Sequence, residues 1–357
     1  MILDPILDIF RGKAITIPPL DGAFRPNTAL DEAKVFAELP KADNLCPAGG
    51  TLFASGGTDL LALKDGATPQ RVETFAAEIT ALAAAPDGSL SVAVDDGTLV
   101  ENGKPAELPK GVSCITALAY GIDGALWLAN GSHKHPASAW VTDLMEKNAS
   151  GSVWRRAPGG KFERVAGGLA WPYGILPLAG EEAVISESWR HRLVRVGKAG
   201  AVPFLKHLPG YPARLSPAQG GGAWLSIFAP RNRLIEAVLR EKHYRYDMMM
   251  EVPRDYWIAP ALASGKSFLE PLQCGGIRTM GVHKAWAPSR SYGLVVRLDR
   301  DLAPVASLHS RANGQRHGTT SAVEVGDRLL VASRGDGCIL DCGDASADVD
   351  LPAPEVM

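Results

Sequence analysis

A short pattern recurs six times along the 357-residue chain, and this internal repeat most strongly limits the folds available to it. Each copy has a Gly or Asp-Gly turn, a strand of apolar and small residues, a polar kink and a second strand. Equivalent positions are separated by 38, 36, 58, 40 and 105 residues, at Leu52, Leu90, Leu126, Val184, Trp224 and Leu329. About 40 residues is the length of one four-stranded propeller blade. The sequence therefore predicts an all-β chain folded as a six-bladed β-propeller; the alternative is an open all-β sandwich with chance internal similarity.

The repeats also set the expected domain limits. Residues 1–32 are predicted to form an irregular N-terminal arm, 33–345 a single propeller domain and 346–357 a C-terminal tail. The two long spacings contain insertions at about 132–151 and 240–292; the first follows the second strand of the third blade, and the second follows the equivalent strand of its own blade. We expect both to form caps on one face, with the larger as a lid over the central cavity, because so long a loop in a compact domain usually has a function. Packing on the propeller flank is the alternative.

A propeller must also hide the edges of its first and last blades. The last repeat, about 319–342, supplies three strands. The segment 33–39 alternates apolar and polar residues and precedes the first repeat. It is therefore predicted to complete the last sheet as its outer strand.

The charge and the cysteine content limit the classes of partner and the cellular location that the sequence predicts. The 37 basic and 39 acidic residues form no dense run of either sign, which argues against nucleic acid or an anionic membrane as partner. Five scattered cysteines without a CxxC pair argue against a disulfide framework. The N-terminus lacks the pattern of a secretion signal, and the sequence has no apolar run of about eighteen residues. The sequence therefore predicts a cytoplasmic protein with a small-molecule partner and leaves its oligomeric state open.

Several motifs resemble one family of propellers. They are GGLAWPYGI at 167–175, AVISESWRHRLVRV at 183–196, LPGYPARLSPAQGGGAWLSI at 208–227 and HGTTSAVEVGDRLLVASRGDGCILD at 317–341. Together they resemble the strictosidine synthase-like branch of the SMP-30/gluconolactonase/paraoxonase propellers, over about residues 38–342. The resemblance implies six blades and a functional site where the starts of the inner strands meet.

In the lactonase members, the resemblance implies a calcium or other divalent ion held by carboxylate and amide oxygens, which polarises the lactone carbonyl. This chain departs from that pattern. Asp43 lies where the family has Glu, Thr116 lies near an expected Asn, Tyr173 replaces another Asn, and Ala213-Arg214 replaces an Asp-Asn pair. A guanidinium and a divalent cation in one pocket repel each other. We therefore expect no metal and no other cofactor; calcium is the alternative if the ligands are misaligned.

The condensing enzymes of the resembling family, the plant Pictet–Spengler synthases, use a Glu on the inner strand of the last blade. In this chain the corresponding position is Thr320, and Glu324 lies at the end of that strand. The resemblance therefore implies neither the metal-dependent lactonase mechanism nor the synthase mechanism in full for this chain.

The starts of the inner strands supply the candidate site. The candidate catalytic residues are Asp43 or His317 as general base, Tyr173 as proton donor or stacking surface, and Arg214 as the group that binds a carboxylate, phosphate or oxyanion. A satisfied polar residue that fills the channel is the alternative for each. The candidate substrate-binding residues are Asn44, Thr116, Trp171, Glu187, Tyr211, Thr319, Thr320 and, on the larger insertion, Trp286.

Glu187 has a second interpretation. It lies in the segment SESWRHR at 186–192, close to Arg190 and Arg192. The same position is acidic across the resembling family. A structural salt bridge is therefore the alternative to a role in substrate binding.

Three functional hypotheses follow. The first is a metal-independent enzyme that acts on a small organic substrate at the propeller mouth, by hydrolysis of a lactone or ester or by lyase or condensation chemistry. The second is a non-catalytic binding or sensor propeller, in which Arg214 holds an anionic ligand. The third is a calcium-dependent lactonase. Hydrolysis is favoured because of the family resemblance.

Overall fold

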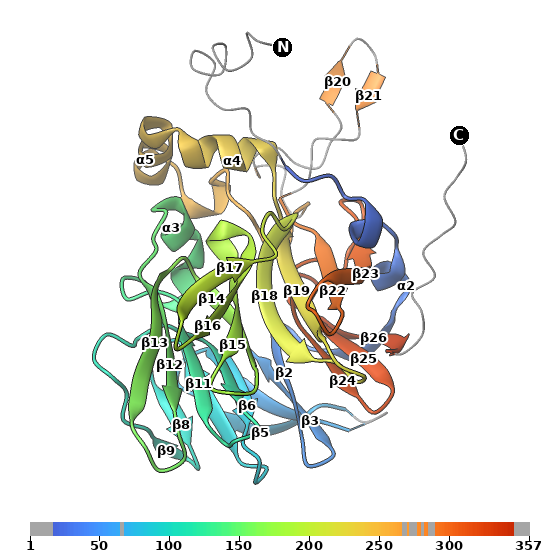
Figure 1. Ribbon diagram of the computed structural model, residues 1–357. Helices are drawn as coiled ribbons and strands as arrows, with labels where there is room; N and C mark the ends of the chain where they lie inside the picture. Colours follow the sequence, from blue (N-terminus) through green and yellow to red (C-terminus); the bar gives the residue numbers. More distant parts are fainter. Residues whose placement is uncertain are drawn as a thin grey trace.

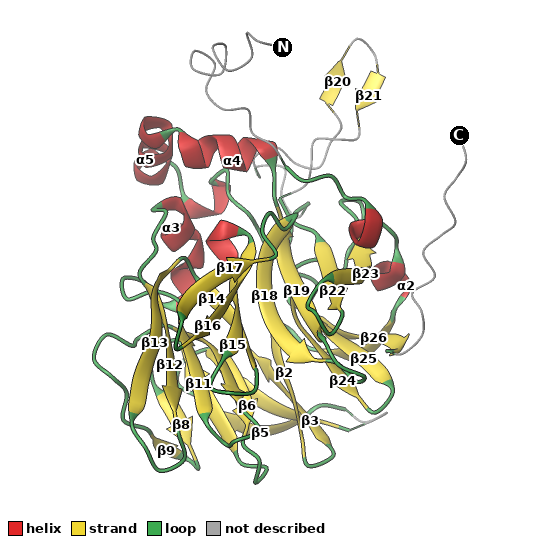
Figure 2. Cartoon of the chain, viewed as in Figure 1, coloured by secondary structure: helices red, strands yellow, loops and turns green. Residues whose placement is uncertain are grey.

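The computed structural model describes residues 17–64, 68–265, 270, 277–279, 282–284 and 290–345. In this part of the chain, six four-stranded antiparallel sheets form the blades of a β-propeller (Figure 1). Helices are few and short, and strands dominate the fold (Figure 2). The predicted all-β, six-bladed fold is confirmed.

The first three blades follow one another along the chain without sharing strands. They are formed by β2 (Ala42–Ala48), β3 (Thr51–Gly56), β4 (Asp59–Leu63) and β5 (Gln70–Thr74); by β6 (Ile79–Ala84), β7 (Leu90–Val94), β8 (Leu99–Glu101) and β9 (Lys104–Pro105); and by β10 (Ile115–Tyr120), β11 (Leu126–Asn130), β12 (Gly151–Arg156) and β13 (Phe162–Leu169). In each, the first strand of the blade is the inner one.

The next two blades continue the pattern, and the last takes one strand from the start of the chain. They are formed by β14 (Pro172–Pro177), β15 (Ala183–Glu187), β16 (Arg192–Gly197) and β17 (Gly200–Phe204); by β18 (Gly210–Pro217), β19 (Ala223–Pro230), β22 (Gly293–Leu298) and β23 (Pro304–Ser310); and by β24 (Thr319–Val325), β25 (Arg328–Ser333), β26 (Cys338–Asp344) and β1 (Lys34–Glu38). The inner strands β2, β6, β10, β14, β18 and β24 contact one another in a closed ring.

The ring closes through β1, as predicted. This strand pairs antiparallel with β26, with Val35 opposite Leu340 and Glu38 opposite Cys338. The outer edge of the last sheet is thereby covered by a strand from the other end of the chain. Ahead of β1 lies a short helix, α2 (Ala29–Glu32), which contacts β23 and β26. The described part of the N-terminal arm is therefore packed on the last two blades.

The first insertion follows β11, as expected, and runs from residue 131 to 150. It contains a 3-10 turn, η2 (Ala137–Ala139), and the helix α3 (Trp140–Met145). The second insertion follows β19, the equivalent strand of its blade. Both insertions therefore lie on the same face of the propeller (Figure 1).

The second insertion begins earlier than the sequence suggested. The segment up to Val238 was expected to continue as a strand, with the insertion starting near residue 240. Instead β19 ends at Pro230 and the helix α4 spans Arg233–Arg240. The Asn232 side chain caps the helix by accepting a hydrogen bond from the Leu234 amide at 2.9 Å. Apolar residues three and four apart point to one face, which is the period of a helix.

After α4, the chain forms the helix α5 (Lys242–Glu251) and the turn η4 (Arg254–Tyr256). A two-stranded hairpin, β20 (Ile277–Thr279) and β21 (Val282–Lys284), precedes the return to β22. Trp286, a candidate substrate-binding residue, lies outside the described residues. Each described helix is too short or too polar to cross a lipid bilayer.

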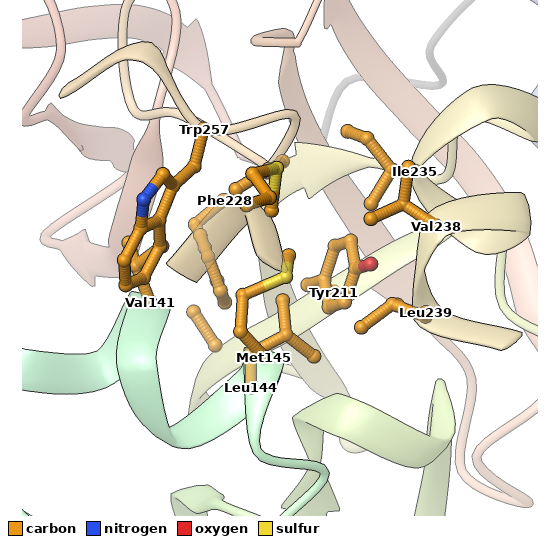
Figure 3. Packing of buried hydrophobic residues seen from close by; sticks show 13 residues of the cluster. Val141, Leu144, Met145, Tyr211, Phe228, Ile235, Val238, Leu239 and Trp257 are labelled. Atoms are coloured by element: carbon orange, nitrogen blue, oxygen red, sulfur yellow. The ribbon is translucent and has the colours of Figure 1, made fainter. Parts of the chain in front are cut away.

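A hydrophobic core anchors the insertions to the propeller. Figure 3 shows side chains of α3 and α4 gathered around Tyr211 and Phe228, which belong to the fifth blade. The residues contributed by the insertions are Val141, Leu144, Met145, Ile235, Val238, Leu239, Met248, Trp257 and Ala259. Since Met145, Tyr211 and Ile235 are fully buried, the two insertions are packed as part of the domain.

Candidate functional site

A cavity of about 250 Å³ lies where the starts of the inner strands meet the two insertions. One side of its lining carries charged and polar residues: Asp43, Glu78, Thr80, Asp95, Thr116 and Arg334. The other side is aromatic and apolar, formed by Trp140, Trp171, Tyr173, Phe228 and Leu262. We call this space the upper cavity. Its division into a charged and an aromatic side suits a small organic molecule with one polar group.

Asp43 lies at the centre of the charged side, on the inner strand of the first blade. It accepts hydrogen bonds from Arg214 Nη1 at 2.5 Å through Oδ1, and from Arg334 Nη1 at 2.6 Å through Oδ2. Only 3% of the residue is exposed. Burial alone would raise the pKa of Asp43, but the charges of Arg214 and Arg334 and the hydrogen bond from Arg214 hold it below its usual value of 3.8. Asp43 is therefore an ionised anchor for two cations and a weak candidate for a general base.

Arg334 is the cation that faces the upper cavity. It follows β25, and its Nη2 lies 3.1 Å from Glu78 Oε2 while its Nη1 binds Asp43. About a quarter of its side chain is exposed. Burial opposes its charge, but Asp43, Tyr173 and Glu78 raise its pKa above the usual value. Arg334 thus presents a permanent, preorganised positive charge.

Arg214 lies beneath the upper cavity and does not line it. Its Nη2 donates to the Thr80 carbonyl at 2.7 Å, and its guanidinium carbon lies 4.9 Å from the centre of the Tyr173 ring. Gly174 makes this arrangement possible, because a Cβ at that position would lie 2.4 Å from the Ala213 carbonyl oxygen. Close packing of β14 on β18 therefore brings Tyr173 over Arg214.

Tyr173 joins the two sides of the cavity. Its ring packs edge-on against Phe228 at 5.6 Å between centroids. Burial raises the pKa of the phenol, and the Asp43 charge raises it further, while Arg214 and Arg334 oppose this. The hydroxyl therefore stays protonated at neutral pH and can donate a hydrogen bond to a bound molecule.

Trp171 forms part of the aromatic side and has an unusual backbone. Its φ is 57°, in the left-handed region that few residues other than glycine adopt. Its indole stacks on Trp189 at 5.1 Å, and Trp189 Nε1 donates to the buried Asp143 of α3 at 2.8 Å. Such strain persists where surrounding structure enforces it and is frequent at ligand sites. The stack holds the Trp171 ring at the cavity wall.

The two insertions meet at the cavity through Ser138. Its amide donates to Asp95 Oδ1 of the second blade at 3.0 Å, and its carbonyl accepts from Arg254 Nη2 of the larger insertion at 2.6 Å. Ala137, Ser138 and Leu262 also line the cavity. Both insertions therefore roof the upper cavity, in keeping with the predicted caps; a lid movement stays a prediction.

Several predicted site residues support the site without lining it. The Thr320 hydroxyl donates to the Asp43 carbonyl at 3.2 Å, and the Asn44 side chain donates to Ser55 Oγ at 2.9 Å. The Thr319 hydroxyl donates to the Leu294 carbonyl, and Tyr211 is fully buried in the core of Figure 3. Among the predicted set, the residues that line the cavity are Asp43, Thr116, Trp171 and Tyr173.

His317 lies outside the cavity lining. Its Nδ1 lies 2.8 Å from Ser291 Oγ and its Nε2 lies 2.8 Å from the Arg311 carbonyl oxygen. Burial lowers the pKa of the imidazole. Because both ring nitrogens are bonded within the protein, the geometry gives no support to the predicted role of His317 as a base.

Glu187 has the contacts of a structural residue. It is fully buried, accepts from the Ala170 amide at 2.8 Å, and pairs with Arg190 at 2.6 Å and Arg192 at 2.5 Å. These contacts agree with the salt-bridge alternative. They fix the turn after β15 next to Trp171.

Glu187→Ala is accordingly expected to destabilise the fold and to leave ligand affinity nearly unchanged. Removal of one partner of a buried ion pair costs about 3–5 kcal/mol, so the midpoint of urea unfolding should fall clearly. Ligand titration at 25 °C should give a Kd within about twofold of the unsubstituted protein. Loss of affinity at unchanged stability would instead assign Glu187 to ligand binding.

Sequence reasoning missed Arg334, Glu78 and Asp95. Arg334 and Asp95 are the first residues after the second strands of their blades, in VASRGDG and VAVDDG. They are thus part of the polar kink between the two strands of each repeat. Glu78 immediately precedes β6, the one inner strand whose start was not searched. A comparison of equivalent positions in all six repeats would have found all three.

The residues present do not fit a divalent cation. Both Asp43 oxygens accept hydrogen bonds from guanidinium groups, those of Arg214 and Arg334. Within the described ranges, no cluster of three or more His, Cys, Asp or Glu side chains could hold a metal. Hard cations require several such oxygens without a competing fixed cation.

No protein-family model matches the sequence, and no curated protein sequence matches it. The fold is similar to that of a gluconolactonase from Xanthomonas campestris, with 14% identity, a TM-score of 0.54 and coverage of 86% of this chain and 87% of that one. It is also similar to regucalcin, a calcium-binding protein from Agrobacterium tumefaciens, with 16% identity, a TM-score of 0.53 and coverage of 87% and 93%. At these identities the likeness establishes the propeller fold alone.

Proposed function

We propose that the upper cavity is the active site of a hydrolase that opens a small lactone or ester without a divalent ion. One observation carries the proposal: the Arg334 guanidinium, held between Asp43 and Glu78, lines the same cavity as the aromatic side chains Trp171, Tyr173 and Phe228. A preorganised cation stabilises the oxyanion of acyl transfer, which is the task that a metal performs in other hydrolases.

The reaction follows from the placement of these groups. The substrate carbonyl oxygen lies against Arg334, and its apolar part lies on Trp171 and Phe228. Glu78 takes a proton from water as the water oxygen bonds to the carbonyl carbon, and the resulting oxyanion is stabilised by Arg334. When the ring C–O bond breaks, the leaving oxygen receives that proton and a hydroxy acid results. Tyr173 donates a hydrogen bond to the same oxygens.

Asp43 acts through Arg334 in this scheme. Its carboxylate is neutralised by two guanidinium groups and its pKa is lowered, so it is a poor proton acceptor. It holds Arg334 in one orientation, and Arg214 holds Asp43. Asp43 and Arg214 are therefore positioning residues in this proposal, while Arg334 and Glu78 contact the reacting atoms.

The gluconolactonase likeness supports lactone hydrolysis only by analogy of fold. Condensation of the strictosidine synthase type has less support, because Thr320 bonds to the Asp43 carbonyl and Glu324 lies at the far end of β24. The carboxylates that line the upper cavity come from the first two blades.

A non-catalytic binding protein is the second candidate. Glu78 also pairs with Lys41, so both carboxylates that contact Arg334 are already engaged in ion pairs. Such a site would hold a small anion at Arg334 without activating water.

A panel of lactones and esters, assayed with and without EDTA, separates these candidates. If the upper cavity hydrolyses lactones without a metal, we expect turnover that EDTA leaves unchanged and that the Glu78→Gln substitution abolishes. Turnover abolished by EDTA and restored by calcium would establish a metal-dependent lactonase. Thermal stabilisation by small carboxylates without turnover of any panel member would establish the binding protein.

A further inference from the structure

A second cavity, of about 530 Å³, opens at the opposite mouth of the central channel. The upper cavity is lined by the starts of the inner strands, whereas this one is lined by their later halves and by the β10–β11 turn. We call it the lower funnel. Its volume falls within the range of about 300–1,000 Å³ that is typical of small-ligand pockets.

The walls of the lower funnel are apolar around the whole ring. Each inner strand contributes a branched apolar side chain with 4–8% of its surface exposed: Leu45, Leu82, Leu118, Ile175, Leu215 and Val323. Apolar surface on all sides favours a hydrocarbon chain over a polar ligand.

The polar side chains of the lower funnel are mostly engaged elsewhere. Glu324 accepts from Trp224 Nε1 and from the Gln219 amide, both at 2.6 Å. Ser216 donates to the Ala322 carbonyl at 2.5 Å. Among the described lining residues, Arg214 is the one cation, and it lies where the lower funnel approaches Asp43.

Arg214 separates the two cavities. Its Nη atoms are directed to Asp43 and to the Thr80 and Thr320 carbonyls, while its side chain also borders the lower funnel. Its buried Nε has no hydrogen-bond acceptor among the described residues. A buried donor without a partner is costly, so an acceptor that reaches this Nε gains a hydrogen bond.

We infer that the lower funnel binds an amphipathic anion, of the class of medium-chain aliphatic carboxylates. The chain lies against the six apolar side chains and the carboxylate lies against Arg214. The bound carboxylate competes with Asp43 for the Arg214 guanidinium. Binding in the lower funnel therefore alters the orientation of Asp43 and Arg334 in the upper cavity. The two cavities are coupled in this way.

Calorimetric titration with octanoate, decanoate and decanol tests this inference directly. Each added methylene should tighten the Kd of the carboxylate about fourfold, and decanoate should bind about tenfold or more tightly than decanol. Equal affinity for decanoate and decanol would overturn the role of Arg214. An affinity independent of chain length would overturn the funnel as the site.

Two substitutions locate the ligand. Ala119→Phe places a ring in the lower funnel from β10 and should abolish decanoate binding, whereas Ala201→Phe on the outer strand β17 is the matched control and should leave it unchanged. Decanoate binding that survives Ala119→Phe would contradict the assignment.

Two further substitutions test the competition. Arg214→Met should weaken decanoate binding, and Asp43→Asn should strengthen it, because Asp43 no longer competes for Arg214. Weaker binding in both variants would refute the competition. Because every readout is a binding constant, these results are independent of whether the upper cavity turns over a lactone.

Discussion

Asp43→Asn is expected to lower the free energy of unfolding by about 3–5 kcal/mol, the cost of removing one partner from a buried ion pair. The carboxylate joins Arg214, 12% exposed, to Arg334, 26% exposed, and is itself almost fully buried. An amide keeps the shape and removes the charge, so two guanidinium groups lose their shared counterion. Urea unfolding followed by tryptophan fluorescence measures the loss.

The same substitution makes a prediction about pH. The pKa of Asp43 in the folded protein is lowered, so its contribution to stability is present above the usual value of 3.8 and is lost as the pH falls through the folded value. The difference in unfolding free energy between the original protein and Asp43→Asn should therefore be constant near neutral pH and shrink below about pH 4. A difference that grows on acidification would contradict the ion-pair argument.

Asp123→Asn is the matched control for stability. Asp123 pairs with Arg155 at 2.6 Å, but 47% of its side chain is exposed. Exposed pairs contribute about 0–1 kcal/mol because water and salt screen them. A similar loss of stability in both variants would show that burial of Asp43 is not what makes its ion pairs strong.

Arg334→Met is expected to lower kcat for lactone hydrolysis by about 10²–10³-fold, the effect of removing one oxyanion-stabilising donor. Methionine keeps an unbranched apolar stem, so the cavity wall is largely preserved. KM should change far less than kcat, because the charge is needed most when the oxyanion forms. Steady-state kinetics on the best substrate of the panel measure both constants.

Arg328→Met controls for the loss of an arginine on the same blade. Arg328 pairs with Asp341 at 2.5 Å between β25 and β26, and it does not line the upper cavity. The Arg328→Met substitution should leave kcat within about twofold of the value for the unsubstituted protein. If Arg334→Met raises KM and spares kcat, Arg334 binds the substrate and does not stabilise the transition state.

The fold and its closure were predictable because they depend on local pattern repeated along the chain. Turn, strand and kink recur with a blade-length period, and the 33–39 strand alternates in a way that suits a sheet edge. The start of the second insertion was missed because the repeat pattern predicted a strand where the chain forms a helix. The segment Arg233–Arg240 follows a strand in a repeat, but its buried Ile235, Val238 and Leu239 have helical spacing.

The site was only partly predictable. Asp43 and Tyr173 were found because they begin inner strands and lie on positions of the resembling family. Arg214 was expected to bind the ligand, yet its guanidinium is bonded to Asp43 and to backbone carbonyls below the upper cavity. The residue that faces the upper cavity is Arg334, which the family resemblance did not mark and which only a comparison of equivalent repeat positions would have singled out.

By itself, the sequence determined the number of blades, their order, the closing strand and the two places where the chain leaves the propeller. Only the tertiary structure determined which charged side chains form ion pairs with each other. Asp43 is 171 residues from Arg214 and 291 from Arg334, and Arg334 is 256 residues from Glu78. Blade formation depends on residues close in sequence, whereas the partner of a channel side chain depends on which inner strands face each other once the ring has closed. The roles of these residues therefore became clear only from the closed ring.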